Sequence, residues 1–328
     1  MKNLNITLTD LDREIWAEEL ADFVPETIYD AHTHIFENRD TAVPANWRQS
    51  TWDLLQQADA QLFPGRQVHR ILFGNPLIKE TIEHGNARTA AAVAHDSASI
   101  GLALVRPTLA PAELEQQFKR HRLMGVKPYR VHAITGDAVE CRITDFLPEA
   151  QIEVVNQHGY IVMLHMSKRL AIADPENLKD LERLTKTYPR VKWILAHCAR
   201  SYYDRPLLKA ADRLKNIPNL WYEISSVCDT DAMDVLLSVA GVDRVMYGSD
   251  DLAVGISRGK YLTFGHAWCY LTETNHRFDL SHCDGRMTFT RYESLRAFRF
   301  GRREIKKLFY SNAKILIDQV RQSRSSRR

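Results

Sequence analysis

The sequence has little of what marks secreted, disulfide-bonded or membrane proteins. Five of its 328 residues are cysteines, an odd number, and none forms a Cys-x-x-Cys pair. We therefore expect reduced thiols and a cytoplasmic location. No apolar run approaches the roughly 18 residues of a transmembrane helix, so we expect no membrane partner. Residues 1–24 carry acidic side chains that a secretory signal would not tolerate, among them Asp10, Asp12, Glu14, Glu18 and Glu19.

An excess of charge of one sign is also lacking. The formal net charge is only +3, and much of that excess lies in the C-terminal residues 321–328. Without a broad basic field, we expect no nucleic-acid partner. We interpret the tail as a solvated terminus, with contact to an acidic partner as the alternative. The composition, 45% hydrophobic and 26% charged, is that of a globular protein with a large core.

What the chain does have is the segment Asp30-Ala31-His32-Thr33-His34, which follows a short apolar run. We predict a strand over residues 28–36. Side chains two positions apart on a strand point to the same side, so His32 and His34 direct two imidazoles at one point, as a metal ion requires. In a chain with 13 histidines this pair alone carries little weight, and one buried and one solvent-facing histidine is the alternative.

Seven further strand-like runs follow, beginning near residues 68, 100, 125, 160, 191, 220 and 244, and each interval has room for one helix. Near-continuous apolar strands that alternate with helices predict an α/β protein with a parallel sheet buried on both faces. Eight such units close into a (β/α)8 TIM barrel. An open doubly wound sheet is the alternative, but the sequence has no glycine-rich first turn. Pro128 counts against a central position for the fourth strand.

The chain divides into three predicted parts. Residues 1–27 are an N-terminal helical extension, whose helix starts at the capping-box-like Thr9–Asp12. This helix packs on the barrel or on a second subunit, and the latter would make a homodimer. Residues 28–320 form the barrel, with a long loop or lid after the eighth strand (251–290). Residues 321–328 are the basic tail.

Three later strands also end in a potential metal ligand: His165 ends the fifth, His197 the sixth and Asp250 the eighth. In a barrel, catalytic groups lie at the C-terminal ends of several strands, so these side chains can converge with His32 and His34 at the mouth. Imidazoles and a carboxylate suit a divalent metal such as zinc, with manganese and iron as alternatives. Any one of these histidines alone indicates a structural role, whereas the set predicts a metal site.

These strand ends, with the closing segment Leu308-Phe309-Tyr310-Ser311-Asn312-Ala313, resemble the amidohydrolase superfamily, and most closely its amidohydrolase-related branch (family 2). The resemblance spans about residues 28–318. It implies metal ligands at His32, His34, His165 and Asp250.

The resemblance implies less about His197 and Lys127. His197 is expected to bind a second metal or to lie beside the first, where it would polarise a substrate carbonyl or activate water. Lys127 lies in the region where binuclear members place a bridging carboxylated lysine. We favour the alternative for Lys127, a contact with a substrate anion or a surface position, and therefore one metal ion.

The branch contains hydrolases and non-oxidative decarboxylases. His197-Cys198-Ala199-Arg200-Ser201 lacks the glycine-rich, proline-containing stretch that tends to follow this histidine in the decarboxylases. We therefore predict an enzyme, a metal-dependent hydrolase that cleaves a C–O or C–N bond of a lactone, ester or amide by metal-activated water, with Asp250 and His197 as catalytic residues. A decarboxylase of a small carboxylic acid and a metal-free, non-catalytic barrel are the alternatives.

Basic side chains follow several of the predicted strands, and they favour a small anionic substrate over the alternative of solvated loop charges. Cys198 is expected in the core rather than as a nucleophile. Glu223, near the end of the seventh strand, either faces the mouth or pairs in the helix layer. The predicted substrate-binding residues are Lys127, Arg130, Arg169 and Arg200.

Overall fold

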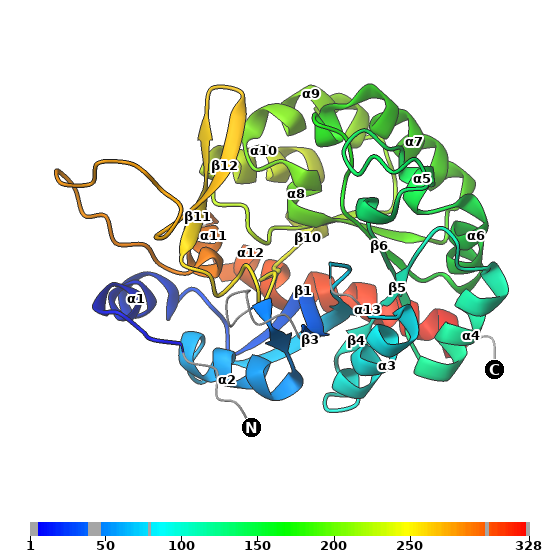
Figure 1. Cartoon of the computed structure of the whole chain (residues 1–328), viewed down its shortest axis with the longest axis horizontal. Coiled ribbons are helices and arrows are strands. Elements are labelled where there is room, and N and C mark those ends of the chain that lie inside the picture. Colours follow the sequence, from blue (N-terminus) through cyan, green and yellow to red (C-terminus); the bar gives the residue numbers. More distant parts are fainter. Residues whose placement is uncertain (1–5, 39–46, 78–79, 299–301, 326–328) are drawn as a thin grey trace.

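A computed structural model of the chain describes residues 6–38, 47–77, 80–298 and 302–325. Parallel strands form the centre of the molecule and helices surround them (Figure 1). The strands are β1 (Thr27–Glu37), β2 (Gln49–Ser50), β3 (Gln67–Gly74), β4 (Ile100–Gly101), β5 (Ala103–Val105), β6 (Gly125–Pro128), β7 (Ile161–Leu164), β8 (Lys192–Leu195), β9 (Leu220–Glu223), β10 (Val245–Met246), β11 (Gly259–Phe264) and β12 (Ala267–Thr272).

The strands are arranged as the predicted (β/α)8 barrel. One sheet has the order β2-β1-β3-β4 and another β10-β9-β8-β7-β6-β5, and every neighbouring pair is parallel except β2 with β1. Backbone hydrogen bonds join the first strand to the eighth: Ala31 donates to the Tyr247 carbonyl at 2.9 Å and His34 to the Asp251 carbonyl at 2.9 Å. The first and last barrel strands are therefore neighbours, as the predicted convergence requires.

The third predicted strand is divided into β4 and β5. Leu102, between them, donates its amide hydrogen to the Leu72 carbonyl on β3 at 2.8 Å, whereas Ala103 to Val105 pair with β6. Pro128 pairs with Val105 of β5. The pairing of β6 with β7 ends at Val126, two residues before Pro128. The missing amide hydrogen of this proline therefore costs no ladder hydrogen bond to β7, and β6 can lie inside the barrel.

Helices cover the outside of the strands (Figure 1). Their amphipathic sequences give each a buried stripe, such as Leu178, Leu181 and Leu184 on α7. The helices are α1 (Asp10–Glu14), η1 (Ile15–Leu20), α2 (Trp52–Leu62), α3 (Ile82–Val93), α4 (Pro111–His121), η3 (Arg130–His132), α5 (Ile143–Phe146), α6 (Glu149–His158), η4 (Ala171–Ala173), α7 (Pro175–Thr187), α8 (Ala196–Arg200), α9 (Asp204–Leu214), α10 (Thr230–Ala240), η5 (Val242–Arg244), α11 (Thr290–Ala297), α12 (Arg302–Lys306), η6 (Lys307–Ser311) and α13 (Asn312–Ser325). In the part of the chain that the structure describes, no helix is long and apolar enough to cross a membrane.

The N-terminal segment folds onto the barrel of its own chain. Thr9 and Asp12 make the predicted capping box at the start of α1. Ile15 and Leu20 are buried, and the Trp16 ring lies 5.7 Å from that of Phe63 between centroids. The helix thus buries its apolar face against the barrel, the first of the two predicted arrangements.

The predicted loop after the eighth strand contains regular structure. Residues 259–272 form the antiparallel hairpin of β11 and β12, which stands away from the barrel in Figure 1. Tyr261 of this hairpin stacks on Tyr202 at 4.3 Å between ring centroids, and the Tyr203 hydroxyl donates to the His266 carbonyl at 3.2 Å. The hairpin is therefore attached to the segment that follows β8. The sequence also predicts a helical stretch from about Tyr292 to Gln322 with an interruption near Gly301, and Gly301 lies outside the described residues.

Candidate metal centre and active site

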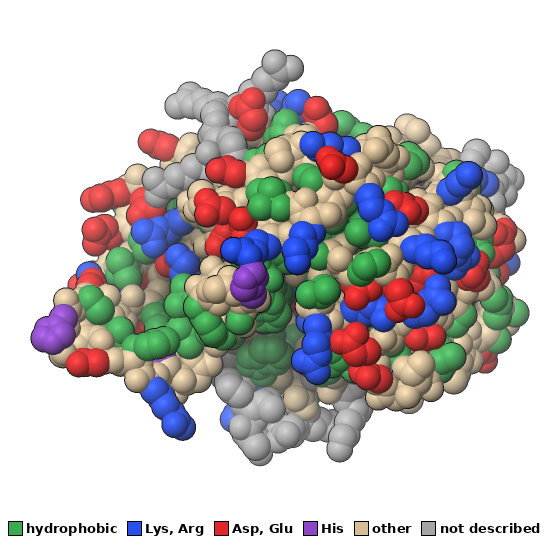
Figure 2. Space-filling view, turned by 90° about the horizontal axis from the view of Figure 1, so that it is seen from above, with side chains coloured by type: hydrophobic (Ala, Val, Ile, Leu, Met, Phe, Trp, Pro, Cys, Tyr) green, Lys and Arg blue, Asp and Glu red, His purple; other side chains and the backbone are tan. Residues whose placement is uncertain are grey.

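A pocket of about 290 Å³ opens at the C-terminal ends of the barrel strands. All five predicted metal-site residues line it: His32, His34, His165, His197 and Asp250. The face seen in Figure 2 is hollowed near its centre, with hydrophobic side chains in the depth and Lys and Arg side chains beside the hollow. The topology of the barrel therefore brings together residues that lie up to 218 positions apart in the sequence.

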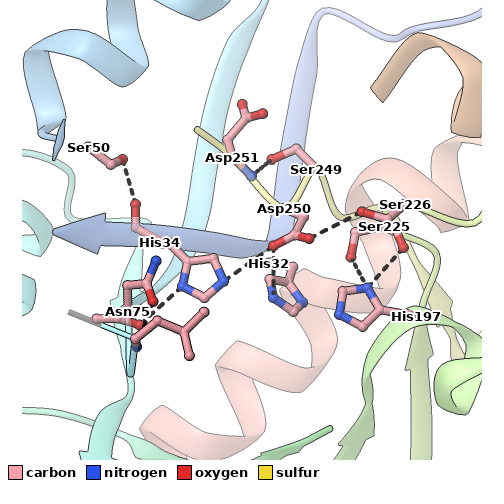
Figure 3. Close-up of polar contacts among 12 residues, drawn as sticks. His32, His34, Ser50, Asn75, His197, Ser225, Ser226, Ser249, Asp250 and Asp251 are labelled. Carbon is pink, nitrogen blue, oxygen red and sulfur yellow. Dashed lines mark hydrogen bonds and ion pairs between the residues drawn. The ribbon is translucent and has the colours of Figure 1, made fainter. Parts of the chain in front are cut away.

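His32, His34 and Asp250 form the closest group of potential metal ligands. The Nε2 atoms of His32 and His34 lie 3.5 and 3.3 Å from Asp250 Oδ1. Figure 3 shows both imidazoles turned toward this carboxylate. The Ser226 hydroxyl donates to its other oxygen, Oδ2, at 3.2 Å. One ligand atom from each of these three residues lies within 4.8 Å of the others, a spacing that suits a single cation.

The four histidines share a hydrogen-bond pattern that leaves Nε2 free. Each Nδ1 faces an oxygen: Glu223 Oε1 at 2.9 Å for His32, and backbone carbonyls at 3.0 to 3.2 Å for the other three, those of Gly74, Met166 and Ser225. Carbonyl and carboxylate oxygens accept, so each Nδ1 carries a hydrogen, and in a neutral ring Nε2 then carries the lone pair. Such partners orient metal-binding histidines.

The Nε2 lone pair of a neutral His32 ring and the Asp250 carboxylate oxygen repel one another at this distance unless a positive charge lies between them. Burial holds the pKa of His32 well below its usual value, and the nearby Lys127 charge lowers it further. A proton on this imidazole is therefore unfavourable. A divalent cation supplies the missing charge without protonating the ring, so the residues present fit a metal ion.

Glu223, which the sequence left undecided, faces inward and is fully buried. Its Oε1 accepts from His32 Nδ1 at 2.9 Å and from the His197 amide at 2.8 Å, and its Oε2 accepts from the Ser225 amide at 2.7 Å. Glu223 could also form a ligand group with His32 and His197. Because three donors already occupy its oxygens, we interpret it as the group that orients His32 rather than as a ligand.

His197 lies two residues beyond the end of β8 rather than on it. It begins a run with left-handed backbone, with φ of 54° at His197, 51° at Cys198, 59° at Ala199 and 59° at Arg200. Left-handed backbone costs roughly 1–2 kcal/mol at a residue with a Cβ, and such outliers occur at functional sites. Cys198 is buried as predicted. This turn places the His197 ring 4.8 Å from that of His32 between centroids.

His165 lines the same pocket but lies outside the closest group. Its ring is 5.3 Å from the His197 ring between centroids. Burial holds the pKa of its imidazole well below the usual value, and the charges of His197, Lys127, Arg200 and Arg130 lower it further. The ring is therefore neutral, as a metal ligand must be. Its role as a fourth ligand stays a prediction.

The four predicted substrate-binding residues lie in different surroundings. Lys127 and Arg130 line the pocket. Arg200 donates to the Lys168 carbonyl at 2.6 Å, and among the described residues neither it nor Arg130 has a carboxylate partner within ion-pair distance. Arg169 is 81% exposed, pairs with Glu140 at 3.4 Å and does not line the pocket.

Three tyrosines of the pocket were not expected from the sequence. Tyr129, Tyr202 and Tyr261 all line it, and Tyr202 also stacks on the His197 ring at 5.9 Å between centroids. Tyr129 follows β6 directly, so its place at a strand end was a usable signal. Tyr202 and Tyr261 come from irregular and hairpin segments, whose positions no periodicity predicts.

Three comparisons with known proteins bear on the fold and the family of this chain. No curated protein matches the chain at a significant level. Solved structures match at low identity. A 4-oxalomesaconate hydratase from Rhodopseudomonas palustris is 14% identical, with 92% of this chain and 98% of that chain covered and a TM-score of 0.56. A probable 2-pyrone-4,6-dicarboxylic acid hydrolase from Acinetobacter baumannii is 16% identical, with coverages of 89% and 99% and a TM-score of 0.57.

A third similar structure is a 5-carboxyvanillate decarboxylase from Novosphingobium aromaticivorans with bound manganese, at 13% identity, coverages of 89% and 97% and a TM-score of 0.55. At these identities the likeness concerns the fold alone. The amidohydrolase family model (Amidohydro_2), by contrast, matches residues 29–317, which include every residue of the predicted metal site. That family is one of metal-dependent enzymes, and the chain belongs to it.

Proposed function

We propose that the protein is a metal-dependent hydrolase that cleaves a C–O or C–N bond of a small anionic substrate. The observation that carries this proposal is the approach of the Nε2 atoms of His32 and His34 to one oxygen of Asp250. These three residues would hold one divalent metal, with His165 as a fourth ligand and zinc as the favoured ion. When bound, the ion would lower the pKa of water and polarise a carbonyl.

The chain's own residues supply the proton chemistry. Asp250 Oδ1 faces the two imidazoles, while Ser226 fixes Oδ2 and so sets the orientation of the carboxylate. The Nδ1 hydrogen of His197 is held by Ser225, which leaves its Nε2 able to accept a proton and to return it to the leaving group. Glu223 holds both His32 and the His197 backbone, so one buried carboxylate sets the relative positions of the two imidazoles.

The charge of the site supports an anionic substrate. Arg130 lines the pocket and hydrogen-bonds to the Ala138 carbonyl. Arg200 does not line the pocket, and its guanidinium is held by the carbonyl oxygens of Met166 and Lys168. Since Arg130 pairs with no carboxylate among the described residues, its guanidinium charge is available to a carboxylate of the substrate.

A non-oxidative decarboxylase is the second candidate, because much of the pocket wall is apolar. Pro76, Leu77, Val131 and Ala253 line it together with the three tyrosines. An apolar wall desolvates a carboxylate and so favours loss of carbon dioxide.

Turnover in ¹⁸O-labelled water distinguishes these functions. We expect the zinc-loaded protein, screened against lactones, esters, amides and carboxylic acids, to incorporate one solvent oxygen into the product. Release of carbon dioxide, with no ¹⁸O in the remaining organic product, would select the decarboxylase. Asp250→Asn should lose at least about 10²-fold in kcat while it remains folded, whereas Asp243→Asn, at an exposed ion pair with Lys307, should not. Near-normal turnover by Asp250→Asn would contradict the mechanism.

A further inference from the structure

Two polar side chains at the end of β6 are buried in the pocket without partners. Lys127 is fully buried, and its Nζ has no hydrogen-bond partner among the residues that the structure describes. The same holds for the hydroxyl of Tyr129. A buried donor without an acceptor costs roughly 1–3 kcal/mol or more, so each calls for an explanation.

The backbone places these two groups on one wall. Tyr129 has extended backbone, with φ −133° and ψ 133°, and it lies two residues beyond Lys127. Side chains two apart on an extended segment point to the same side. Both residues line the pocket that holds the metal-site histidines, and the rings of Tyr129 and His34 lie 6.4 Å apart between centroids.

The surroundings of Lys127 stabilise its charge only in part. Its Nζ lies 4.8 Å from the centre of the Phe73 ring and 5.1 Å from that of Tyr129, both within cation–π range. Burial lowers the pKa of Lys127 to about 8, although the charges of Glu223 and Asp250 raise it. The amine is therefore still largely protonated at pH 7.

The nearby carboxylates are already engaged. Glu223 accepts from His32, His197 and Ser225. Asp250 faces two imidazoles and accepts from Ser226. The ammonium of Lys127 and the hydroxyl of Tyr129 thus remain as two donors that line the pocket of the predicted metal ligands, and neither has an acceptor on the described chain.

We propose that Lys127 and Tyr129 form a subsite for one negatively charged oxygen of the substrate, such as that of a carboxylate. This inference rests on the proposed function, and it names a specificity determinant of that site. Lysine supplies the charge and tyrosine a directed O–H donor. Burial keeps Tyr129 protonated, because it raises the pKa of the phenol well above its usual value. A neutral amide in the same place leaves the ammonium uncompensated, so the pair selects an anionic oxygen over a neutral group of the same shape.

Calorimetric titration of the zinc-loaded protein with benzoate and with benzamide, its neutral isostere, tests this subsite. We expect the wild type to bind benzoate at least about tenfold more tightly than benzamide. Lys127→Met should weaken benzoate binding about tenfold or more, which is about 1.4 kcal/mol, and Tyr129→Phe should weaken it severalfold. Binding of benzamide should change little. Lys186→Met, on the exposed face of α7, is the matched control and should bind both probes as the wild type does.

Equal affinity of the wild type for both probes, no binding of benzoate, or unchanged benzoate binding in both variants would overturn the inference. A carbamate signal in ¹³C NMR after equilibration with ¹³C-bicarbonate, if lost in Lys127→Met, would also overturn it, because the amine would then be carboxylated. Metal content measured on the same samples distinguishes failure of this inference from failure of the proposed function. A protein without zinc contradicts the metal mechanism, whereas the benzoate comparison can still be made.

Discussion

Glu223 illustrates how one buried residue organises the site. It holds the Nδ1 hydrogen of His32, which fixes the tautomer whose Nε2 faces Asp250, and it also holds the His197 amide. Carboxylates that hydrogen-bond to a metal-binding histidine raise its basicity and fix its orientation. Glu223 would therefore act through His32 on a metal ion bound there.

Replacing this carboxylate should weaken metal binding. In Glu223→Gln, the neutral amide is a poorer acceptor for His32, so we expect zinc affinity to fall roughly 10–100-fold. Competition with a chromophoric chelator measures this change. Glu153→Gln, at an exposed position on α6, is the control. Unchanged affinity in Glu223→Gln would show that the buried carboxylate serves the fold rather than the metal.

Residue type was enough to predict part of the site. Histidine or aspartate at the ends of four barrel strands predicted a site only as a set, and all five predicted metal-site residues line one pocket. Glu223 and Tyr129 could not be assigned in the same way. A glutamate near a strand end pairs equally well in the helix layer, and the burial that leaves the Tyr129 hydroxyl without a partner depends on segments far away in the sequence.

At the scale of elements, the eight barrel strands could be predicted from apolar runs, because a strand buried on both faces has a nearly continuous apolar sequence. The β11–β12 hairpin did not. Its residues are largely exposed or half-buried, so no clear alternation marks them. The left-handed turn from His197 to Arg200 was also missed, since none of its residues is the glycine that such a backbone favours.

The N-terminal segment is fixed to the long segment after β10 through Asp12. This buried carboxylate accepts from Arg258 Nη1 at 2.9 Å, from the Thr288 hydroxyl at 2.7 Å and from the Thr9 amide at 2.7 Å. Burial raises the pKa of the Asp12 carboxyl, but the hydrogen bonds from Arg258, Thr9 and Thr288 outweigh it and hold the pKa below its usual value.

This pKa shift predicts a pH-dependent contribution to stability. A carboxyl whose folded pKa is depressed stabilises the fold above its unfolded pKa, about 3.9, and loses that contribution as the pH falls through the folded value. We expect Asp12→Asn to lower the free energy of unfolding by about 1–3 kcal/mol at pH 7, and this difference from wild type to shrink at pH 3.5. Urea unfolding at both pH values measures it. Asp10→Asn, on the same helix but exposed, should have little effect, and a difference for Asp12→Asn that does not change with pH would contradict the assignment.

At the scale of the whole molecule, a buried charge network lies beneath the site where the barrel closes. Arg70 of β3 contacts Asp30 of β1 at 3.1 Å and also contacts Asp59 of α2. Arg291 of α11 contacts Asp59 at 3.5 Å and Asp251, the residue after Asp250. The network thus joins β1 and β3 to α2, α11 and Asp251, next to the predicted metal ligand Asp250.

Removing one charge from this network should destabilise the whole fold. Arg291→Met leaves Asp251 and Asp59 buried without this partner, so we expect a loss of roughly 3–5 kcal/mol in the free energy of unfolding. Arg286→Met, which removes an exposed ion pair with Asp284, should cost about 1 kcal/mol or less. Equilibrium urea unfolding compares the two, and equal losses would show that the buried network contributes no more than a surface pair.

The central claim is that His32, His34 and Asp250 hold a divalent metal at the mouth of the barrel. Elemental analysis of protein purified without chelator, beside the double variant His32→Ala/His34→Ala, tests it most directly. We predict about one equivalent of zinc, manganese or iron per chain in the wild type and its loss in a folded double variant. No metal in the wild type, even after metal is added, or the same metal content in both proteins, would contradict it.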